Sequence, residues 1–458
     1  MRPEYLRSAF LASSADDRRS LGPESCLPFL KFLGWSYLCR PFLLTRSAIQ
    51  QRFLLMNDLF TIPGSGCEPA TGDLFAPVSA GVGKQINGSD HDFLRKQHVP
   101  PFCSKGPGLS LVDLFCGAGG ISLGIAEAAY DLGLSLHIPL AVDFEPTAVK
   151  VYKENFKFAN AIQANVSDLF SSSDQFDNLT DTEQQLRAQV GKVDILVGGP
   201  PCQGHSDLNN YSRRNDPKNS LYFIMARAAY VLQPSHIIIE NVLGARHDKN
   251  GVVHKTISAL QELGYRVEMA PVDLTVIGVP QTRRRLIIVA SKSATEGITK
   301  AVERFTTPVR NLEWAIKDLE DSHSPNLEET PSKPSKDNMA RINYLFDNDI
   351  DDLPNHMRPP CHAHGNHSYK SIYGRLKWSE PSQTITSGFY SMCMGRYVHP
   401  SRRRTLTARE AARLQFFPDY FKFNAAGSRT AIAKIIGNAV PPKLSYIFAY
   451  SLICDNRI

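Results

Sequence analysis

Short apolar runs alternate with helical stretches from residue 109 onward, and this alternation constrains the fold more than any other feature. Each run has the length of a strand and is apolar almost throughout, as expected of strands buried on both faces. Such βαβα order predicts an α/β domain with a mostly parallel sheet and helices on both faces. The strand candidates are 109–115 (LSLVDLF), 137–145 (HIPLAVDFE), 192–199 (KVDILVGG), 235–241 (SHIIIEN) and 284–290 (RRLIIVA).

The chain as a whole has ordinary globular composition and a mild positive charge. It has 458 residues, a formal net charge of +6 and nine cysteines. The charge is compatible with a nucleic-acid partner without requiring one. The cysteines form no CxxC pair, so neither a disulfide framework nor a zinc ribbon is indicated. The longest apolar stretch, 27–38, is interrupted by Lys31 and too short to span a bilayer, and we expect a cytoplasmic protein.

Changes in sequence texture suggest four segments. Residues 1–108 are rich in Gly and Pro and read as a poorly ordered extension, in which Met56 offers an alternative start. Residues 109–290 carry the alternating pattern. Residues 291–400 are polar and irregular, and we expect a smaller domain there. Helical periodicity returns in 401–458, which predicts a return of the chain to the first domain.

A glycine-rich turn follows the first strand candidate. In DLFCGAGG, Asp113 precedes glycines that let a ligand approach the backbone at a helix start. Because the acid comes first, a ligand with a positive or hydrogen-bond-donating part, such as an amino acid moiety, suits the turn better than a phosphate. About 20 residues further on, Asp143 is placed to accept ribose hydroxyls and Phe144 to stack on a purine. The alternative is a tight turn followed by a surface acid.

Cys202 and Glu240 follow two strand candidates that one helix separates. Parallel strands end at the same edge of a sheet, so we expect Cys202, Glu240, Asp113 and Asp143 to converge on one rim. A thiolate and a carboxyl group at one site suit covalent catalysis with acid assistance. Taken singly, the cysteine could be an inert small hydrophobe and the glutamate a helix N-cap or surface acid.

Arginines cluster at the last strand candidate. In an extended QTRRR, Arg283 and Arg285 point to one face and could grip a phosphate or polarise a carbonyl. The alternative is a solvated edge strand on which Arg discourages sheet pairing.

Six motifs together resemble the cytosine-C5 DNA methyltransferases of the bacterial modification type. They are DLFCGAGG, GGPPCQGHS, ENV, QTRRR, RTLTAREAARLQFFPD and GNAVPP, in that order from residue 110 to the C-terminus. The resemblance implies a Rossmann-like, S-adenosyl-L-methionine-dependent fold with a small target-recognition domain. It also implies transfer of a methyl group to C5 of a cytosine flipped out of duplex DNA.

The resemblance assigns residues to the cofactor. The glycine turn would meet its methionine part, Asp143 its ribose and Phe144 its adenine, while Asn165 stands where relatives usually carry Asp, and Ala439 where some carry Ser. The full set of cofactor positions implied by the resemblance is Phe115, Gly117, Gly119, Gly120, Asp143, Phe144, Asn165, Pro201, Leu221, Asn438 and Val440.

The resemblance also assigns catalytic roles. Cys202 would attack C6 of the cytosine, and Glu240 would hold N3 and the exocyclic amine. Arg283 and Arg285 would contact the cytosine carbonyl and order the catalytic loop.

The expected DNA contacts lie in the last third of the chain. By resemblance these are Thr384 and Thr386, and the basic stretch adds Arg402, Arg403 and Arg404. In the same stretch Thr407 and Glu410 form a capping-box pattern, so a solvated helix start is equally compatible.

A cluster of Cys361, His362, His364 and His367 could suggest zinc, but its spacing is not that of a standard finger. We expect a polar DNA-facing loop there and no metal.

The expected partner is double-stranded DNA, with a cognate restriction endonuclease acting on the same site and no membrane. We expect a monomer in the bacterial cytoplasm. Two alternatives stay open: a tRNA cytosine-C5 methyltransferase, which CQGHS and the long 291–400 region disfavour, and a catalytically silent DNA-binding relative.

Overall fold

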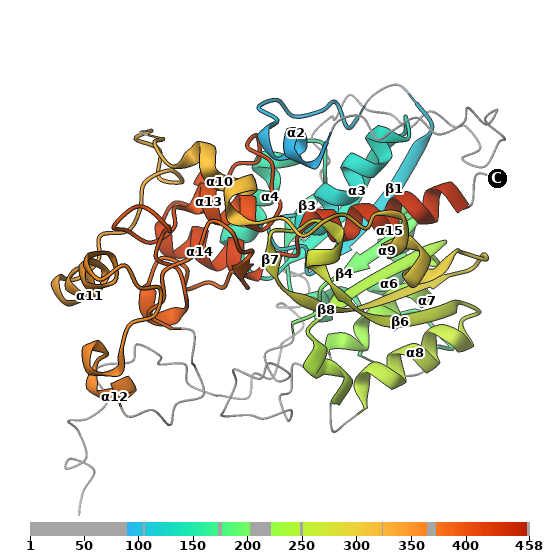
Figure 1. Ribbon diagram of the computed structural model, residues 1–458. Helices are drawn as coiled ribbons and strands as arrows, with labels where there is room; N and C mark the ends of the chain where they lie inside the picture. The colour runs from blue at the N-terminus through green and yellow to red at the C-terminus, as the bar shows by residue number, and fades with distance from the viewer. Residues whose placement is uncertain are drawn as a thin grey trace, which may run out of the picture. The chain divides into compact units, whose positions relative to one another are not determined.

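A seven-stranded sheet forms the centre of the protein (Figure 1). The computed structural model describes residues 89–103, 106–172, 176–201, 221–247, 251–322, 324–363 and 372–455, all within one compact unit. The strands of the sheet are β1 (Gly108–Leu114), β2 (Ser135–Asp143), β3 (Ala161–Gln163), β4 (Ile195–Gly198), β5 (His236–Asn241), β6 (Arg266–Asp273) and β8 (Arg284–Ser291).

The sheet has the order β3-β2-β1-β4-β5-β8-β6. Strands β1 to β5 run parallel, and β8 runs antiparallel to both of its neighbours, β5 and β6. The central strands are buried on both faces, as their apolar sequences predicted. The predicted mostly parallel α/β fold is therefore confirmed.

The sequence pattern did not predict two strands of the seven-stranded sheet, β3 and β6. Strand β3 has three residues, too few for a pattern. Edge strand β6 mixes polar and apolar residues and contains Pro271, which an edge tolerates because no neighbour needs its N–H.

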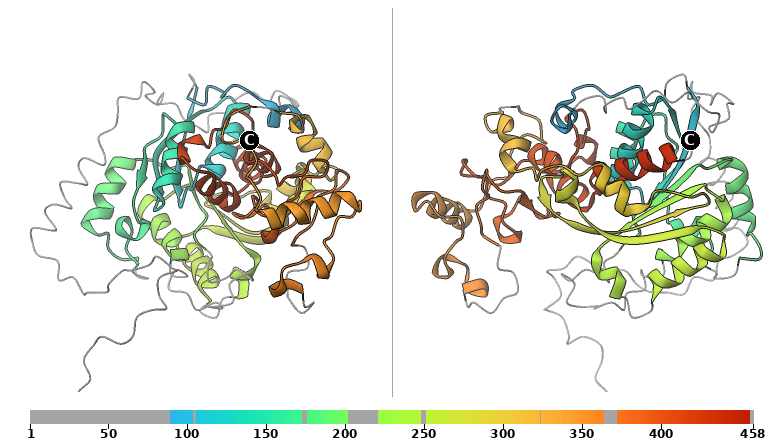
Figure 2. Two further views of the ribbon diagram at one scale, coloured as in Figure 1. Left: turned by 90° about the vertical axis from the view of Figure 1, so that its left-hand side faces the viewer. Right: turned by 45° about the vertical axis from the view of Figure 1, so that its right-hand side comes forward.

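Helices cover the sheet on both sides (Figures 1 and 2). Helices α3, α4, α9 and α15 lie on one face, where α15 packs along α3, and α6, α7 and α8 lie on the other. These helices are α3 (Gly120–Asp131), α4 (Pro146–Asn155), α6 (Asp181–Val190), α7 (Ile224–Leu232), α8 (Val252–Glu262), α9 (Gly297–Arg304) and α15 (Pro442–Asp455). Helix α9 contacts β6 and α15, so the chain stays on the sheet after residue 291.

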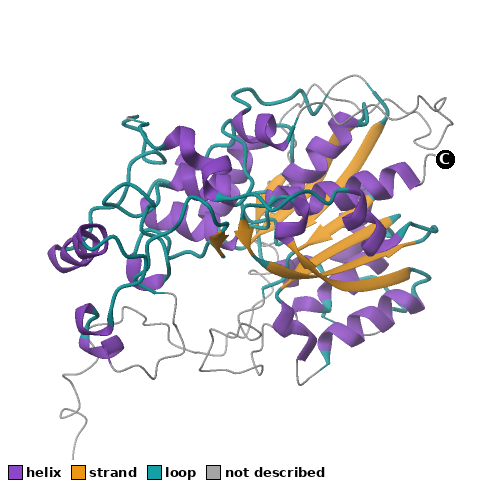
Figure 3. Ribbon diagram, viewed as in Figure 1, coloured by secondary structure: helices purple, strands orange, loops and turns teal. Residues whose placement is uncertain are grey.

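Residues 317–407 contain long loops between short helices (Figure 3). Ile342, Leu345, Tyr373, Met392 and Val398 belong to a small apolar cluster of their own, separate from the main core. The remaining helices are α2 (Asp90–Arg95), α5 (Val166–Leu169), α10 (Leu312–Ile316), α11 (Lys336–Asp347), α12 (Pro360–Ala363), α13 (Ala408–Leu414) and α14 (Arg429–Asn438). A two-stranded parallel ladder of β7 (Gln281–Thr282) and β9 (Ser382–Gln383) ties this region to the sheet domain. The 3-10 helices are η2 (Leu243–His247), η3 (Leu274–Ile277), η4 (Lys317–Leu319), η5 (Asn355–Met357), η6 (Met392–Met394) and η7 (Asn424–Ala426).

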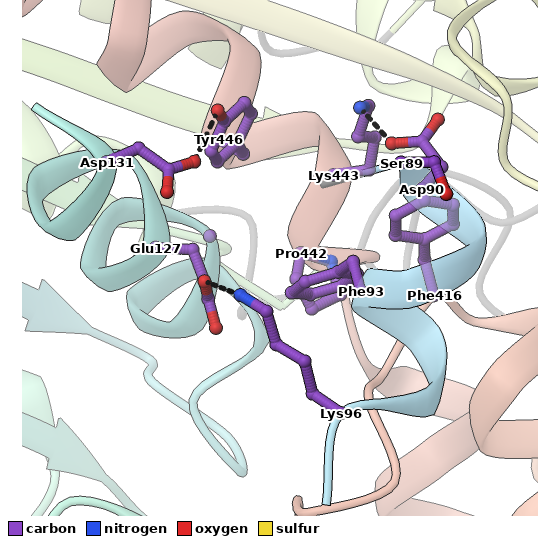
Figure 4. A pocket seen from close by; sticks show the side chains of 11 residues that line it. Ser89, Asp90, Phe93, Lys96, Glu127, Asp131, Phe416, Pro442, Lys443 and Tyr446 are labelled. Atoms are coloured by element: carbon purple, nitrogen blue, oxygen red, sulfur yellow. Dashed lines mark hydrogen bonds and ion pairs between the residues drawn. The ribbon is translucent and has the colours of Figure 1, made fainter. Parts of the chain in front are cut away.

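The expected poorly ordered extension does not reach as far as residue 108. Residues 89–103 carry helix α2, which packs against α3 and α15 (Figure 4). Asp90 accepts a hydrogen bond from Lys443 Nζ at 2.6 Å, and Lys96 Nζ donates to Glu127 at 2.9 Å. The prediction failed because six helical residues are too few to show a period.

A cavity between α2, α3 and α15 has a volume of about 40 Å³. Ligand pockets usually measure hundreds of Å³, whereas this space suits a water molecule or two. We therefore treat it as part of the packing of α2. Among the described residues, no helix is both long and apolar enough to cross a membrane.

Candidate active site

The glycine turn links the end of β1 to the start of α3. Its backbone is left-handed at Phe115, Gly117 and Gly119, with φ of 59°, 54° and 92°. The amide of Gly117 donates to Asp143 Oδ2 at 2.8 Å, which fastens the turn to the end of β2. A Cβ on Gly117 would meet no described residue within 4 Å, so in the described part of the chain this side of the turn is open.

Asp143 and Phe144 lie beside this turn, at the end of β2. The second oxygen of Asp143 accepts from the amide of Glu145 at 2.8 Å, so each oxygen already holds one backbone N–H. Burial raises the pKa of this carboxyl, and the two amide bonds oppose that rise. The Phe144 ring is 74% exposed, which is unusual for a phenylalanine and leaves its face available for stacking.

Asp113 does not face the rim, contrary to prediction. Its side chain is fully buried beneath the turn, where Oδ2 accepts from the hydroxyl of Ser122 at 2.6 Å. That hydroxyl also lies 2.8 Å from the hydroxyl of Tyr152. Burial raises the pKa of Asp113 to about 7. The error arose because consecutive strand residues point to opposite faces, and Asp113 points into the helix layer.

The C-terminal GNAVPP segment lies against the first turn of α3. A Cβ on Gly120 would collide with the carbonyl oxygen of Val440, so only glycine allows this approach. Asn438 is exposed beside Val440 at the end of α14. The structure thus brings the predicted positions Gly120, Asn438 and Val440 together.

Two further predicted cofactor positions follow other strands, and a third precedes a helix. Asn165 is exposed, and its Oδ1 accepts from the amide of Ser167 at 3.2 Å as the N-cap of α5. Pro201 follows β4, and Leu221 precedes α7; both are half-buried.

Glu240 and Arg285 form an ion pair at the end of β5. Arg285 Nε lies 2.6 Å from Glu240 Oε1, and both side chains are mostly buried. A Cβ on Gly199 would lie 3.5 Å from Glu240 Oε2, so the residues after β4 pass directly over this carboxylate. Cys202 itself lies outside the described residues.

Sequence reasoning missed Tyr222. Its hydroxyl is buried and has no hydrogen-bond partner among the described residues. Burial raises its pKa, with a smaller contribution from the charge of Glu240. No sequence signal distinguishes this tyrosine from an ordinary residue on the apolar face of a helix.

Arg283 does not join Arg285. Its side chain is 3% exposed, and Nη2 donates to the carbonyl oxygen of Ala439 at 3.0 Å. In the described residues Arg283 therefore holds the GNAVPP segment, and its contact with the cytosine or the catalytic loop stays a prediction.

Comparison with known proteins decides the family. The family model described as "C-5 cytosine-specific DNA methylase" matches residues 109–454. The chain belongs to this family. As a C-5 cytosine-specific DNA methylase, the protein is a methyltransferase that acts on cytosine in DNA and takes the methyl group from S-adenosyl-L-methionine.

Relatives of this methylase share most of its length. The Type II methyltransferase M1.BsuMI of Bacillus subtilis is 40% identical over 364 residues, covering 79% of this chain and 84% of the relative. The Type II methyltransferase M1.HphI of Haemophilus parahaemolyticus is 31% identical, covering 76% and 87%. The S. pombe Dnmt2 methyltransferase structure is similar in fold, with a TM-score of 0.53 and 18% identity, covering 75% of this chain and 98% of that one.

Two predicted DNA contacts of the methylase are engaged within the protein. Thr384 Oγ1 donates to the carbonyl oxygen of Thr282 at 2.7 Å, and Thr386 Oγ1 lies 3.0 Å from the hydroxyl of Tyr397. Both hydroxyls therefore make hydrogen bonds within the protein, next to the β7–β9 ladder.

The three predicted arginines also have carboxylate partners. Arg404 makes two hydrogen bonds, of 2.8 and 2.7 Å, to the buried Glu410, which closes the capping box of α13 with Thr407. Arg404 is thus held by Glu410, and its contact with DNA stays a prediction. Arg402 and Arg403 are exposed, and they pair with Asp321 and Asp347.

The described residues contain no group of three or more His, Cys, Asp or Glu side chains that could hold a metal. His364 and His367 of the predicted cluster lie outside them.

Proposed function

We propose that this methylase modifies cytosine within one duplex DNA sequence through a covalent adduct formed by Cys202, as the modification enzyme of a restriction system. The observation that carries the proposal is the Glu240–Arg285 pair beside Gly199, because GGPPC must leave β4 at this point. The restriction role is supported by the 40% identical Type II methyltransferase of Bacillus subtilis.

Cytosine C5 is a poor nucleophile because the ring is aromatic. Addition of the Cys202 thiolate to C6 forms an S–C6 bond and makes C5 enamine-like. Glu240 supplies a proton to N3 as charge builds there, and Arg285 holds the carboxyl group in place. Once C5 carries the methyl group, loss of the C5 proton to a base, return of the N3 proton to Glu240 and expulsion of the cysteine thiolate restore the aromatic ring.

The residues around the glycine turn suit the methyl donor. S-adenosyl-L-methionine supplies the methyl group as an electrophile to C5. The open space above Gly117 would take its methionine part, and Asp143 would accept its ribose hydroxyls through the lone pairs that the backbone leaves free. The exposed Phe144 ring would stack on its adenine. Asn165 would lie near the adenine, and the remaining cofactor-lining positions would be Pro201, Leu221, Asn438 and Val440.

The target base must leave the helix, since none of this chemistry fits inside a stacked duplex. We assign DNA recognition to residues 291–400 apart from α9, which packs on the sheet, catalysis to 109–290, and completion of the cofactor site to 401–458. The separate apolar cluster around Ile342 and Met392 supports a recognition unit with its own small core. We further propose that the protein acts as a cytoplasmic monomer, with a restriction endonuclease acting on the same sequence.

Labelled S-adenosyl-L-methionine tests this proposal. Wild-type protein should label C5 of cytosine in duplex DNA and leave tRNA unlabelled. A Cys202→Ser variant should bind DNA and cofactor but transfer no methyl group. Label confined to tRNA would refute the substrate, and substantial transfer by the variant would refute the covalent route.

A further inference from the structure

Three polar side chains lie together in the interior of the protein. Gln281 and Gln415 are fully buried, and Arg283 is 3% exposed. Gln415 Oε1 accepts from Gln281 Nε2 at 2.8 Å and faces Arg283 Nη1 at 3.4 Å. Buried polar groups are costly unless their hydrogen bonds are made, so the geometry of such a cluster is tightly specified.

The cluster holds the GNAVPP segment at two points. Gln415 Nε2 donates to the carbonyl oxygen of Ile436 at 2.6 Å, in the last turn of α14. Arg283 Nη2 donates to the carbonyl oxygen of Ala439 at 3.0 Å. Asn438 lies between these two anchors, and Val440 follows the second. The carbonyl oxygen of Val440 contacts the first turn of α3 at Gly120.

The cluster also holds the segment that leads into β9. Gln281 Oε1 accepts from the amide of Ile385 at 3.2 Å, and Gln281 itself pairs with Ser382 in the β7–β9 ladder. The last turn of α14 meets the same segment, since a Cβ on Gly437 would collide with the backbone nitrogen of Ser387. The same buried cluster therefore makes hydrogen bonds to both the recognition segment and the GNAVPP segment.

We propose that Gln415 is a positioning residue for methyl transfer, which fixes the cofactor-lining segment 438–440 relative to the DNA-recognition segment 382–387. Gln415 is suited to this role because its side-chain amide accepts a hydrogen bond from Gln281 in β7 and donates one to Ile436 in α14. The inference rests on the proposed assignment of Asn438 and Val440 to the cofactor site.

The test replaces Gln415 with Met, which keeps the side-chain length and removes both hydrogen-bonding functions. The variant leaves the Ile436 carbonyl without its side-chain donor and Gln281 without its side-chain acceptor. We expect the Kd for S-adenosylmethionine, measured by titration calorimetry, to rise about tenfold, equivalent to about 1.4 kcal/mol. We expect kcat with saturating cofactor and DNA to fall as well.

Tyr265→Phe serves as the matched control. It also removes one buried hydrogen bond, from the Tyr265 hydroxyl to the carbonyl oxygen of Pro234 at 2.7 Å. This bond lies beside the first residues of β5 and β6, at the opposite end of β8 from Arg283. The melting temperature of this variant should fall while its cofactor Kd stays at the wild-type value. An equal rise in Kd in both variants would reduce the role of Gln415 to general stability and overturn the proposal.

If the Met variant fails to fold, a Gln415→Glu variant tests the same proposal. It preserves an acceptor for Gln281 and Arg283 but turns a carboxylate oxygen towards the Ile436 carbonyl, so a rise in Kd at least as large is expected. An unchanged cofactor Kd in a folded Gln415 variant contradicts the proposal.

An Asn438→Ala variant distinguishes failure of the cofactor assignment from failure of the positioning role of Gln415. If this exposed substitution weakens cofactor binding and the Gln415 variants do not, positioning by Gln415 is wrong and the cofactor assignment stands. If Asn438→Ala leaves the Kd unchanged, the assignment of this segment to the cofactor fails, and the positioning proposal falls with it.

Discussion

Arg285 Nε lies 2.6 Å from Glu240 Oε1, across the junction of two neighbouring antiparallel strands, β5 and β8. The two side chains come from positions 45 residues apart, yet the ladder that pairs Glu240 with Ile287 fixes their separation. The guanidinium holds a carboxyl group at the rim where the proposed target base enters.

Glu240→Gln should remove the proton source for N3 and leave the fold intact. We expect kcat to fall about 10²- to 10⁴-fold, the usual worth of general acid–base assistance, while the cofactor Kd changes little. Steady-state methylation with cofactor titration measures both. A variant with near wild-type kcat would remove Glu240 from the chemistry.

Asp113 should make stability depend on pH. Its pKa of about 7 in the folded protein exceeds its usual value of 3.8, so the folded state holds the proton more tightly. The stabilisation is fully present below about pH 4 and is lost as pH rises towards 7, by roughly 1.4 kcal/mol for each pKa unit. Urea unfolding of wild type and Asp113→Asn across this range should therefore give curves that diverge; parallel curves would contradict a buried, protonated Asp113.

Phe144→Ala should weaken cofactor binding without unfolding the protein, because the ring is largely exposed. Loss of one stacking face is worth about 1–3 kcal/mol for a base, so the Kd should rise about tenfold. Tyr130→Ala, at another partly exposed aromatic on α3, should leave the Kd unchanged. The stacking role would be refuted by a Phe144 variant that binds like wild type.

The three consecutive arginines should separate into two classes. Arg404→Ala leaves the buried Glu410 without its ion pair, and we expect a loss of about 3 kcal/mol in the free energy of unfolding. Arg402→Ala and Arg403→Ala break exposed pairs and should cost about 0–1 kcal/mol each. Equal costs at all three positions in denaturant unfolding would show that the pairing of Arg404 carries no weight.

The mostly parallel α/β sheet and the sites at strand ends followed from the sequence, because both depend only on apolar strands and on the rule that ligands bind at the carboxyl ends of parallel strands. Glu240, Asp143 and Phe144 were therefore placed correctly at the rim. Side-chain direction was not predicted for Asp113, which lies inside β1 and points into the helix layer, or for Arg283, which precedes β8; both were assigned to the site although both side chains are buried. Nor did the sequence show which arginine of SRRRT would find a buried carboxylate, since Glu410 becomes a partner of Arg404 only after α13 has formed. Helix α2 was missed because its stability comes from contacts with α3 and α15, not from its own pattern.

The central claim is cytosine methylation in DNA through Cys202. Bisulfite sequencing of plasmid DNA from a host without cytosine methylation, expressing either the wild type or Cys202→Ala, tests it most directly. We predict that the wild type protects one cytosine in every copy of a single short sequence, and that the variant protects none. Unprotected cytosines throughout the wild-type sample, or the same protected sequence in both samples, would contradict the account.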